Sequence, residues 1–80
     1  MPRLELFGTS RCPHTQELRE WLEWQGRDFV EHDVELDASA RHRMLQLSSG
    51  QRSVPILVED NVVLQIGWQG RTCMIEADPT

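Results

Sequence analysis

The 80-residue sequence has little of what several protein classes require. Its two cysteines are too few for the disulfide framework of a small secreted domain. It has no apolar run of the about 18 residues that a membrane-spanning helix needs, and no basic segment followed by an apolar leader. The net charge of -5 argues against a general binder of nucleic acids or anionic membranes. We therefore expect a soluble, uncleaved cytoplasmic protein with no nucleic-acid or membrane partner.

The composition that is present suits one small domain spanning residues 1–80. Apolar residues make up 39% of the chain, which is enough for a single modest core. The sequence contains no internal repeat, low-complexity tract or linker that would divide it. We expect a single domain that is monomeric.

The strongest local signal surrounds Cys12. The apolar run Leu4–Phe7 predicts a strand and is followed by a Gly-Thr-Ser turn. Pro13 suits the first position of a helix, and a helical pattern continues to Gln25, followed by Gly26 as the expected cap. Cys12 would thus lie at a helix N-terminus, where free N–H groups and the helix dipole stabilise an anion. This placement lowers a cysteine pKa and predicts a reactive thiolate.

Periodicity and turn signals divide the rest of the chain into five further elements. Leu18, Trp21 and Leu22 form the apolar stripe of the first helix, and we assign all three to the core. Two β-branched runs around a short turn predict an antiparallel hairpin. The remaining expected elements are an edge strand at 28–34, a helix at 40–47 with N-cap candidates at 37–39, hairpin strands at 54–59 and 62–66, and a short helix at 71–77. The element order is βαβαββα.

This order, combined with three short motifs, resembles a glutaredoxin. The motifs are Cys12–Thr15 (Cys-Pro-His-Thr), Ser53–Pro55 (Ser-Val-Pro) and Ile66–Trp68 (Ile-Gly-Trp). The resemblance implies an α/β thioredoxin fold with a four-stranded mixed sheet flanked by three helices. Segments 22–27, 50–55 and 67–71 further resemble the UXX-star family of glutaredoxin-like proteins, some of which carry selenocysteine where this chain has a cysteine.

The resemblance also implies an activity, namely thiol–disulfide exchange with Cys12 as the nucleophile. The substrate would be a disulfide-containing protein or a low-molecular-weight disulfide. The family pattern implies a cis Val54–Pro55 bond, with the Val54 backbone pairing the substrate backbone, although the sequence alone favours trans. Gly67 would form the glycine turn that borders the cleft. We expect no metal and no resident cofactor, with glutathione as a possible co-substrate.

Several side chains near the motif have more than one interpretation. Arg11 either adds positive charge beside the thiolate or is simply solvated. Pro13 and His14 would border the substrate, and a base role for His14 is the weaker alternative because a helix N-terminus disfavours its cation. Trp68 either covers the thiol or packs in the core.

Thr15 stands where a dithiol motif has its second cysteine. Its hydroxyl is a candidate partner for the thiolate, and Cys12 cannot close a disulfide within its own turn. Either an external thiol such as glutathione or Cys73 would then resolve the mixed disulfide. Alternatively, Cys73 is a small buried residue of the last helix.

Three departures weaken the glutathione-specific interpretation. Thr9 replaces the lysine that glutaredoxins usually have before the motif, and Trp68 replaces the second glycine of a Gly-Gly pair. The acidic pair that holds the amino end of glutathione has no counterpart in 70–73. Two alternative functions therefore stay open, a carrier of a [2Fe–2S] cluster built as in monothiol glutaredoxins and a non-catalytic thioredoxin-fold interaction module.

Overall fold

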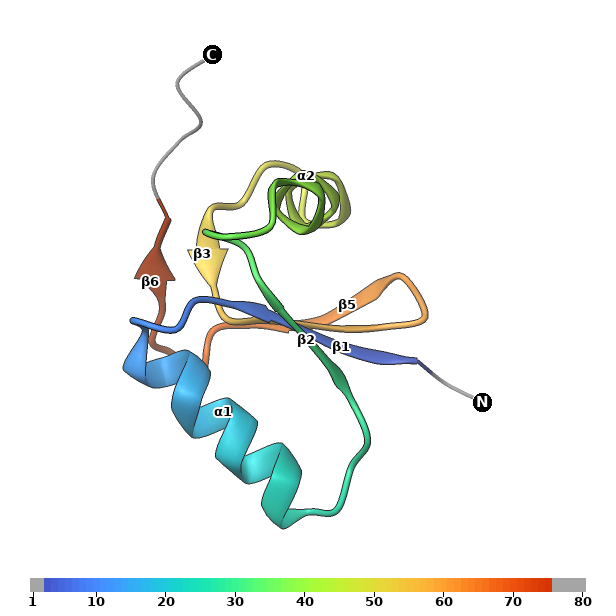
Figure 1. Ribbon diagram of the computed structural model, residues 1–80, viewed down its shortest axis with the longest axis vertical. Helices are drawn as coiled ribbons and strands as arrows, with labels where there is room; N and C mark the ends of the chain where they lie inside the picture. The colour runs from blue at the N-terminus through green and yellow to red at the C-terminus, as the bar shows by residue number, and fades with distance from the viewer. Residues whose placement is uncertain (1–2, 76–80) are drawn as a thin grey trace.

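A mixed four-stranded sheet with one helix on each side forms the body of the chain (Figure 1). The computed structural model describes residues 3–75. The elements are β1 (Leu4–Gly8), α1 (Pro13–Trp24), β2 (Val30–Asp33), α2 (Ala38–Leu47), β3 (Ser53–Val54), β4 (Ile56–Glu59), β5 (Val62–Ile66) and β6 (Cys73–Met74). No helix of this part of the chain is long and apolar enough to cross a membrane.

The sheet has the strand order β2-β1-β4-β5. β1 is central, parallel to β2 and antiparallel to β4, so β2 lies at the predicted edge. The predicted hairpin is also present, because β4 and β5 are antiparallel and Glu59 pairs with Val62. Asp60 and Asn61 close it with φ values of 50° and 66°, the left-handed conformation that a two-residue hairpin turn requires.

The alternation of β1 side chains divides the core between the two faces of the sheet. Leu4 and Leu6 lie on the α1 face with Leu18 and Leu22 of the helix. On the other face, β1 contributes Phe7 to a cluster that includes side chains of β4 and α2. β1 is buried along its whole length, between its two neighbouring strands and the two clusters of the core.

The predicted position of Trp21 in the core is wrong, since this side chain is 37% exposed. It lies at the border of the stripe that Leu18 and Leu22 bury, and it contacts Trp68 instead.

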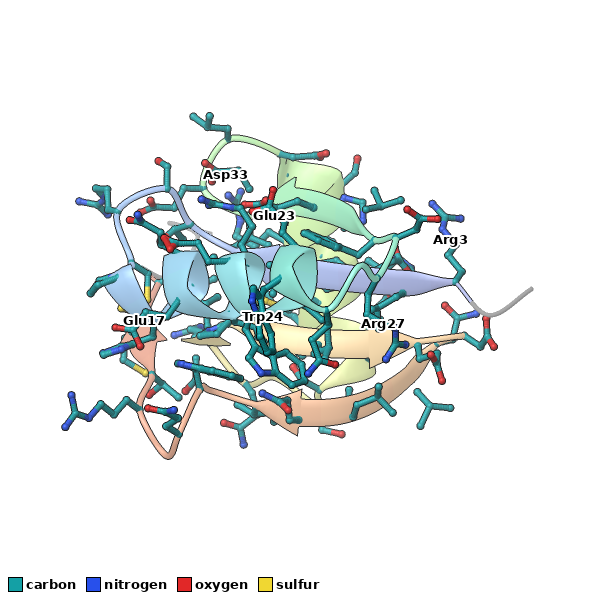
Figure 2. All side chains as sticks on the ribbon, turned by 90° about the horizontal axis from the view of Figure 1, so that it is seen from below. Arg3, Glu17, Glu23, Trp24, Arg27 and Asp33 are labelled. Atoms are coloured by element: carbon teal, nitrogen blue, oxygen red, sulfur yellow. A yellow bond between two sulfur atoms is a disulfide. The ribbon has the colours of Figure 1, made fainter. Side chains whose placement is uncertain are left out.

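Figure 2 looks onto α1, which lies in front of β1, while β5 runs along the lower margin. Three apolar side chains of β5 stay exposed: Val62, Leu64 and Ile66.

The predicted third flanking helix is also wrong for the residues that the structure describes. Residues Cys73–Met74 form β6, which pairs with β3 in a separate two-stranded ladder (Figure 1). The expected helix at 71–77 extends beyond the described residues, but its first half is extended. Long-range pairing with β3 and a disulfide override the weak local preference, and the β-branched Thr72 and Ile75 favour an extended chain.

Candidate redox site

The two cysteines of the chain lie together and form a disulfide. Cys12 and Cys73 are 61 residues apart in sequence, and their Cα atoms are 6.0 Å apart. This separation falls within the range that a disulfide spans without backbone movement. Of the predicted alternatives for Cys73, the buried residue of a helix is therefore wrong.

The local sequence places Cys12 at the start of α1 as predicted. The turn after β1 closes with a hydrogen bond from the Cys12 N–H to the Thr9 carbonyl at 3.4 Å. Cys12 is the N-cap residue with extended backbone angles, Pro13 begins the helix, and the Gln16 N–H donates to the Cys12 carbonyl at 3.2 Å. The side chain of Cys12 is thus held at the positive end of a 12-residue helix, where a thiolate is stabilised.

β6 brings Cys73 to this position. In the antiparallel ladder, Val54 of β3 pairs with Cys73, and Ser53 pairs with Met74. The Val54–Pro55 bond is cis, as the resemblance implies. Pro55 does not continue a single strand from 54 to 59 as predicted, but separates β3 from β4.

A small cleft of about 160 Å³ adjoins the disulfide, lined by Thr9, Arg11, Cys12, Glu35, Cys73 and Met74. Arg11 and Glu35 form a two-point ion pair across it, with Arg11 Nε 3.1 Å from Glu35 Oε1. Arg11 is therefore an ion-paired side chain, and neither a purely solvated cation nor one directed only at the thiol. Glu35 was not predicted as a site residue, although its position just after a strand parallel to β1 could have indicated that it lies near Cys12.

Thr15 is fully buried below the motif, and its Oγ1 is the only buried side-chain N or O atom of the described residues that lacks a hydrogen-bond partner. Buried hydroxyls almost always have a partner. Gly8 makes the space for this side chain, because a Cβ at Gly8 would lie 2.6 Å from Thr15 Oγ1. In the disulfide state the Cys12 sulfur is bonded to Cys73, so a thiolate is not present to accept from Thr15.

The other predicted site residues lie outside the cleft. Pro13 is exposed and His14 is half-buried in the first turn of α1. Gly67 has a φ of 91° and donates its N–H to the Pro55 carbonyl at 2.6 Å, so it supports the turn before β4. Trp68 is half-buried and packs on the α1 face against Trp21, with ring centroids 5.4 Å apart, and it does not line the cleft at the disulfide.

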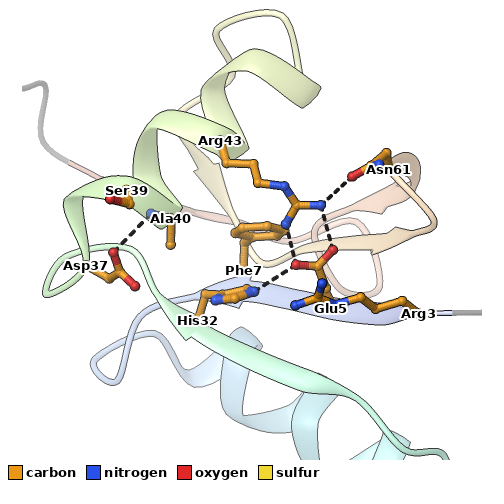
Figure 3. Close-up of a pocket in the computed structure, with 9 residues that line it drawn as sticks. All are labelled: Arg3, Glu5, Phe7, His32, Asp37, Ser39, Ala40, Arg43 and Asn61. Carbon is orange, nitrogen blue, oxygen red and sulfur yellow. Dashed lines mark hydrogen bonds and ion pairs between the residues drawn. The ribbon is translucent and has the colours of Figure 1, made fainter.

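A second cluster, which the sequence analysis did not identify, surrounds Glu5 on the α2 face (Figure 3). Glu5 is only 1% exposed and is held by both Nη atoms of Arg43 and by His32 Nε2 at 2.9 Å. The hydrogen bonds from Arg43 lower the Glu5 pKa from 4.5 to about 2 despite its burial. The Arg43 guanidinium also lies over the Phe7 ring, 5.5 Å from its centroid.

The charges of this cluster pair with one another. It shares no lining residue with the cleft at the disulfide. The described residues also contain no group of three or more histidine, cysteine or acidic side chains that could hold a metal ion. The cleft at Cys12 and Cys73 is therefore the candidate functional site.

Comparison with known proteins identifies the family. The glutaredoxin family profile matches residues 4–64. The chain belongs to the glutaredoxin family. A protein from Synechocystis sp. named "Probable glutaredoxin slr1562" is 32% identical over 59 residues, which cover 72% of this chain but only 54% of that protein. The chain therefore spans about half the length of this curated relative.

Solved structures show that this glutaredoxin-family chain has the thioredoxin-like fold. The thioredoxin-like protein BC3987 superposes with a TM-score of 0.75 at 31% identity, covering 84% of this chain and 89% of that one. A glutaredoxin from Archaeoglobus fulgidus gives 0.71 at 23% identity, covering 86% and 78%. A buckwheat glutaredoxin–glutathione complex gives 0.67 at 16% identity, covering 82% and 61%. The last two support the fold alone.

Proposed function

We propose that the chain is a two-cysteine thiol–disulfide oxidoreductase in which Cys12 is the nucleophile and Cys73 is the resolving thiol. The observation that carries this proposal is the Cys12–Cys73 disulfide, which joins a cysteine at a helix N-terminus to one on the neighbouring ladder. Membership of the glutaredoxin family supports the same chemistry. The finer assignment to the UXX-star group rests on segments 22–27, 50–55 and 67–71 and is part of the proposal.

The reaction requires both thiols in turn. The Cys12 thiolate attacks one sulfur of a substrate disulfide, the S–S bond breaks, and one substrate thiolate leaves and takes up a proton. The Cys73 thiolate then attacks the Cys12 sulfur of the mixed disulfide and releases the second substrate thiol. Two electrons have passed to the substrate, and the protein holds the Cys12–Cys73 disulfide. Two equivalents of an external thiol restore the dithiol and become a disulfide themselves.

Thr15 has a role in the reduced protein under this proposal. Reduction leaves a Cys12 thiolate at the N-cap, three residues before a buried hydroxyl that has no partner in the disulfide state. Donation from Thr15 Oγ1 to this thiolate would satisfy the hydroxyl and stabilise the charged sulfur. Thr15 therefore favours the thiolate, and with it the nucleophilic form of Cys12.

Glutathione is the proposed external thiol. A buckwheat glutaredoxin of the same fold is known in complex with glutathione, which supports this choice. The ion pair of Arg11 and Glu35 offers a charge of each sign at the cleft, and glutathione also carries groups of both signs. The protein is expected to act in a cytoplasmic, reducing compartment, where glutathione is the common small thiol.

Activity of cysteine variants tests the proposal. The reduced protein should reduce a small aromatic disulfide, Cys12→Ser should be inactive, and Ser10→Ala, an exposed change in the same turn, should keep wild-type activity. Cys73→Ser should still attack once and should accumulate a mixed disulfide that mass spectrometry detects on Cys12. A Cys12→Ser variant as active as the wild type would refute the proposal.

A further inference from the structure

The short ladder between β3 and β6 lies directly beside the nucleophile Cys12, and β6 covers the backbone edge of β3 there. β3 has only two residues, and within the described chain its one strand partner is β6. Val54 pairs with Cys73, which is also the residue bonded to Cys12. The chain thus presents to its own nucleophile a short extended strand whose first residue is a disulfide-bonded cysteine.

A polypeptide disulfide that approaches Cys12 in an extended form would need the same edge. Strand addition to an open sheet edge is a general mode of peptide recognition, in which backbone hydrogen bonds supply affinity and alternate side chains supply specificity. The register that brings a cysteine to Cys12 is the one that Cys73 takes opposite Val54. β6 therefore lies where such a substrate strand would lie.

Burial of the nucleophile supports this interpretation. Cys12 is only 2% exposed in the disulfide state and packs in a cluster with Val54 and Ile75, with Cys73 against it. In this state Cys12 has no free thiolate, so the position of β6 matters once the bond is reduced, when a β6 still in this place would cover the Cys12 sulfur. β6 must leave before Cys12 can react, so substrate and β6 exclude one another.

Besides the disulfide, the described residues hold β6 by a few polar contacts and by the burial of the adjoining Ile75, which is only 6% exposed in the core cluster. The polar contacts include the two-residue ladder, a hydrogen bond from the Ile75 N–H to the Arg52 carbonyl at 2.9 Å, and a contact of Ser53 Oγ with Met74 Sδ at 3.4 Å. Isolated two-stranded ladders are marginally stable in water, and each backbone hydrogen bond contributes little net stability. The disulfide adds a covalent link that holds β6 against Cys12.

A tight turn precedes β6. Trp68 and Arg71 exchange two backbone hydrogen bonds of 2.8 and 2.9 Å, which close this turn. Gly70 within this turn has a φ of 78°, and a side chain at Gly67 just before the turn would clash with the Arg71 carbonyl. β6 can therefore leave β3 by rotation after this turn while β5 stays in the sheet.

We propose that β6 is an internal ligand of the β3 edge, docked by the disulfide and displaced on reduction by an extended, cysteine-containing polypeptide. This inference rests on the proposed function and names its substrate class as a protein disulfide. β6 itself indicates the preferred sequence, because the residues beside Cys73 are uncharged: Thr72, Met74 and Ile75.

Thiol exchange and strand exchange then proceed together. The reduced protein with β6 released binds the substrate strand on β3, and the Cys12 thiolate attacks its disulfide, which releases the other substrate cysteine as a thiol. Cys73 next attacks the Cys12 sulfur, the substrate cysteine leaves as a thiolate that takes up a proton, and β6 replaces the substrate strand. Two electrons pass from the protein dithiol to the substrate, and two equivalents of external thiol open the resulting disulfide.

Amide hydrogen exchange on the whole chain, oxidised and reduced, tests the docking of β6. The Ile75 amide, which donates to Arg52, should exchange about tenfold or more faster after reduction. The Asp60 amide, which donates to the Arg3 carbonyl in the hairpin turn, is the internal control and should change by less than about twofold. Equal protection of Ile75 in both states would overturn the proposal, because β6 would then stay docked without the disulfide.

Peptide binding supplies the second measurement. A blocked peptide of residues 70–75 that carries the C73S change should shift the amide resonances of Ser53 and Val54 in the reduced protein and leave the oxidised protein unchanged. A peptide of the same composition in scrambled order is the control. Binding to both states, or to neither, would overturn the proposal. If the same sample reduces a small disulfide in that case, only the strand exchange fails, whereas loss of all disulfide reduction would refute the proposed function itself.

Discussion

Opening the Cys12–Cys73 disulfide should lower the stability of the chain by a large and calculable amount. The bond closes a loop with a sequence separation of 61 residues, which covers most of the 80-residue chain. In the chain-entropy treatment, a cross-link of this separation restricts the unfolded state by about 4 kcal/mol at 25 °C. Small domains have a total stability of only about 5–15 kcal/mol, so the bond supplies a large share.

Urea unfolding of the oxidised and reduced wild type measures this difference directly. We expect the free energy of unfolding to fall by about 4 kcal/mol on reduction, which corresponds to a fall of about 15 °C or more in Tm for a domain of this size. Cys73→Ser should unfold like the reduced wild type under both conditions. Equal unfolding midpoints for oxidised and reduced wild type would show that the disulfide does not close in solution, and the mechanism built on it would fail.

Two further predictions concern the core. Glu5→Gln should lower the free energy of unfolding by about 3 kcal/mol at pH 7, since Arg43 lowers the Glu5 pKa to about 2. The stability that the ionised Glu5 contributes is complete above pH 4.5 and disappears as the pH falls through 2. Urea unfolding at several pH values, with exposed Glu17→Gln as control, should show that the difference in free energy of unfolding between Glu5→Gln and the wild type disappears in acid. A difference that stays constant with pH would contradict this prediction. Gly8→Ala should cost about 1–3 kcal/mol because its Cβ would clash with Thr15. Adding Thr15→Ala should recover part of this loss in a double-mutant cycle, and strict additivity would contradict the clash.

Local signals were sufficient to predict Cys12 and most of the sheet. The apolar run of β1, the turn after it and the proline at the start of α1 all lie within about ten residues of one another, and each has a direct physical consequence for the backbone. The two-residue turn at Asp60 and Asn61 sets the pairing next to it, of Glu59 with Val62, in the same way, although the register shifts between Leu57 and Val58. These features depend on neighbours in sequence, so the sequence alone could indicate them.

Features that depend on distant partners could not be predicted in the same way. Whether Cys73 pairs with Cys12 is decided by β6, whose extended conformation comes from pairing with β3 and not from its own propensity. For this reason the predicted helix at 71–77 was wrong over its described half. Trp21 was wrongly assigned to the core because helical periodicity shows which side of α1 is apolar but not how wide the buried strip of that side is. The sheet below α1 covers only part of the apolar side of the helix.

The Glu5 cluster shows a signal that sequence analysis could have used. A carboxylate in the middle of the apolar strand Leu4–Gly8 must face either water or a cation, and a central strand offers no water. The sequence thus required a buried cation, but any of eight arginines qualified. Only the packing of α2 over β1 selects Arg43.

The long separation of the two cysteines has a consequence that a one-turn dithiol motif would not have. Within one turn of helix, a disulfide forms and opens with little change in the backbone. Here the second thiol lies on a two-residue strand near the chain end, so forming the bond also orders that strand on β3. Formation of the disulfide therefore also places β6 over Cys12 and along the backbone edge of β3. Oxidised protein should be unreactive toward polypeptide disulfides until a small external thiol opens the bond, because neither Cys12 nor Cys73 is then a free thiol that could attack. Half-buried Cys73 is the more accessible of the two sulfurs for that external thiol, since Cys12 is only 2% exposed.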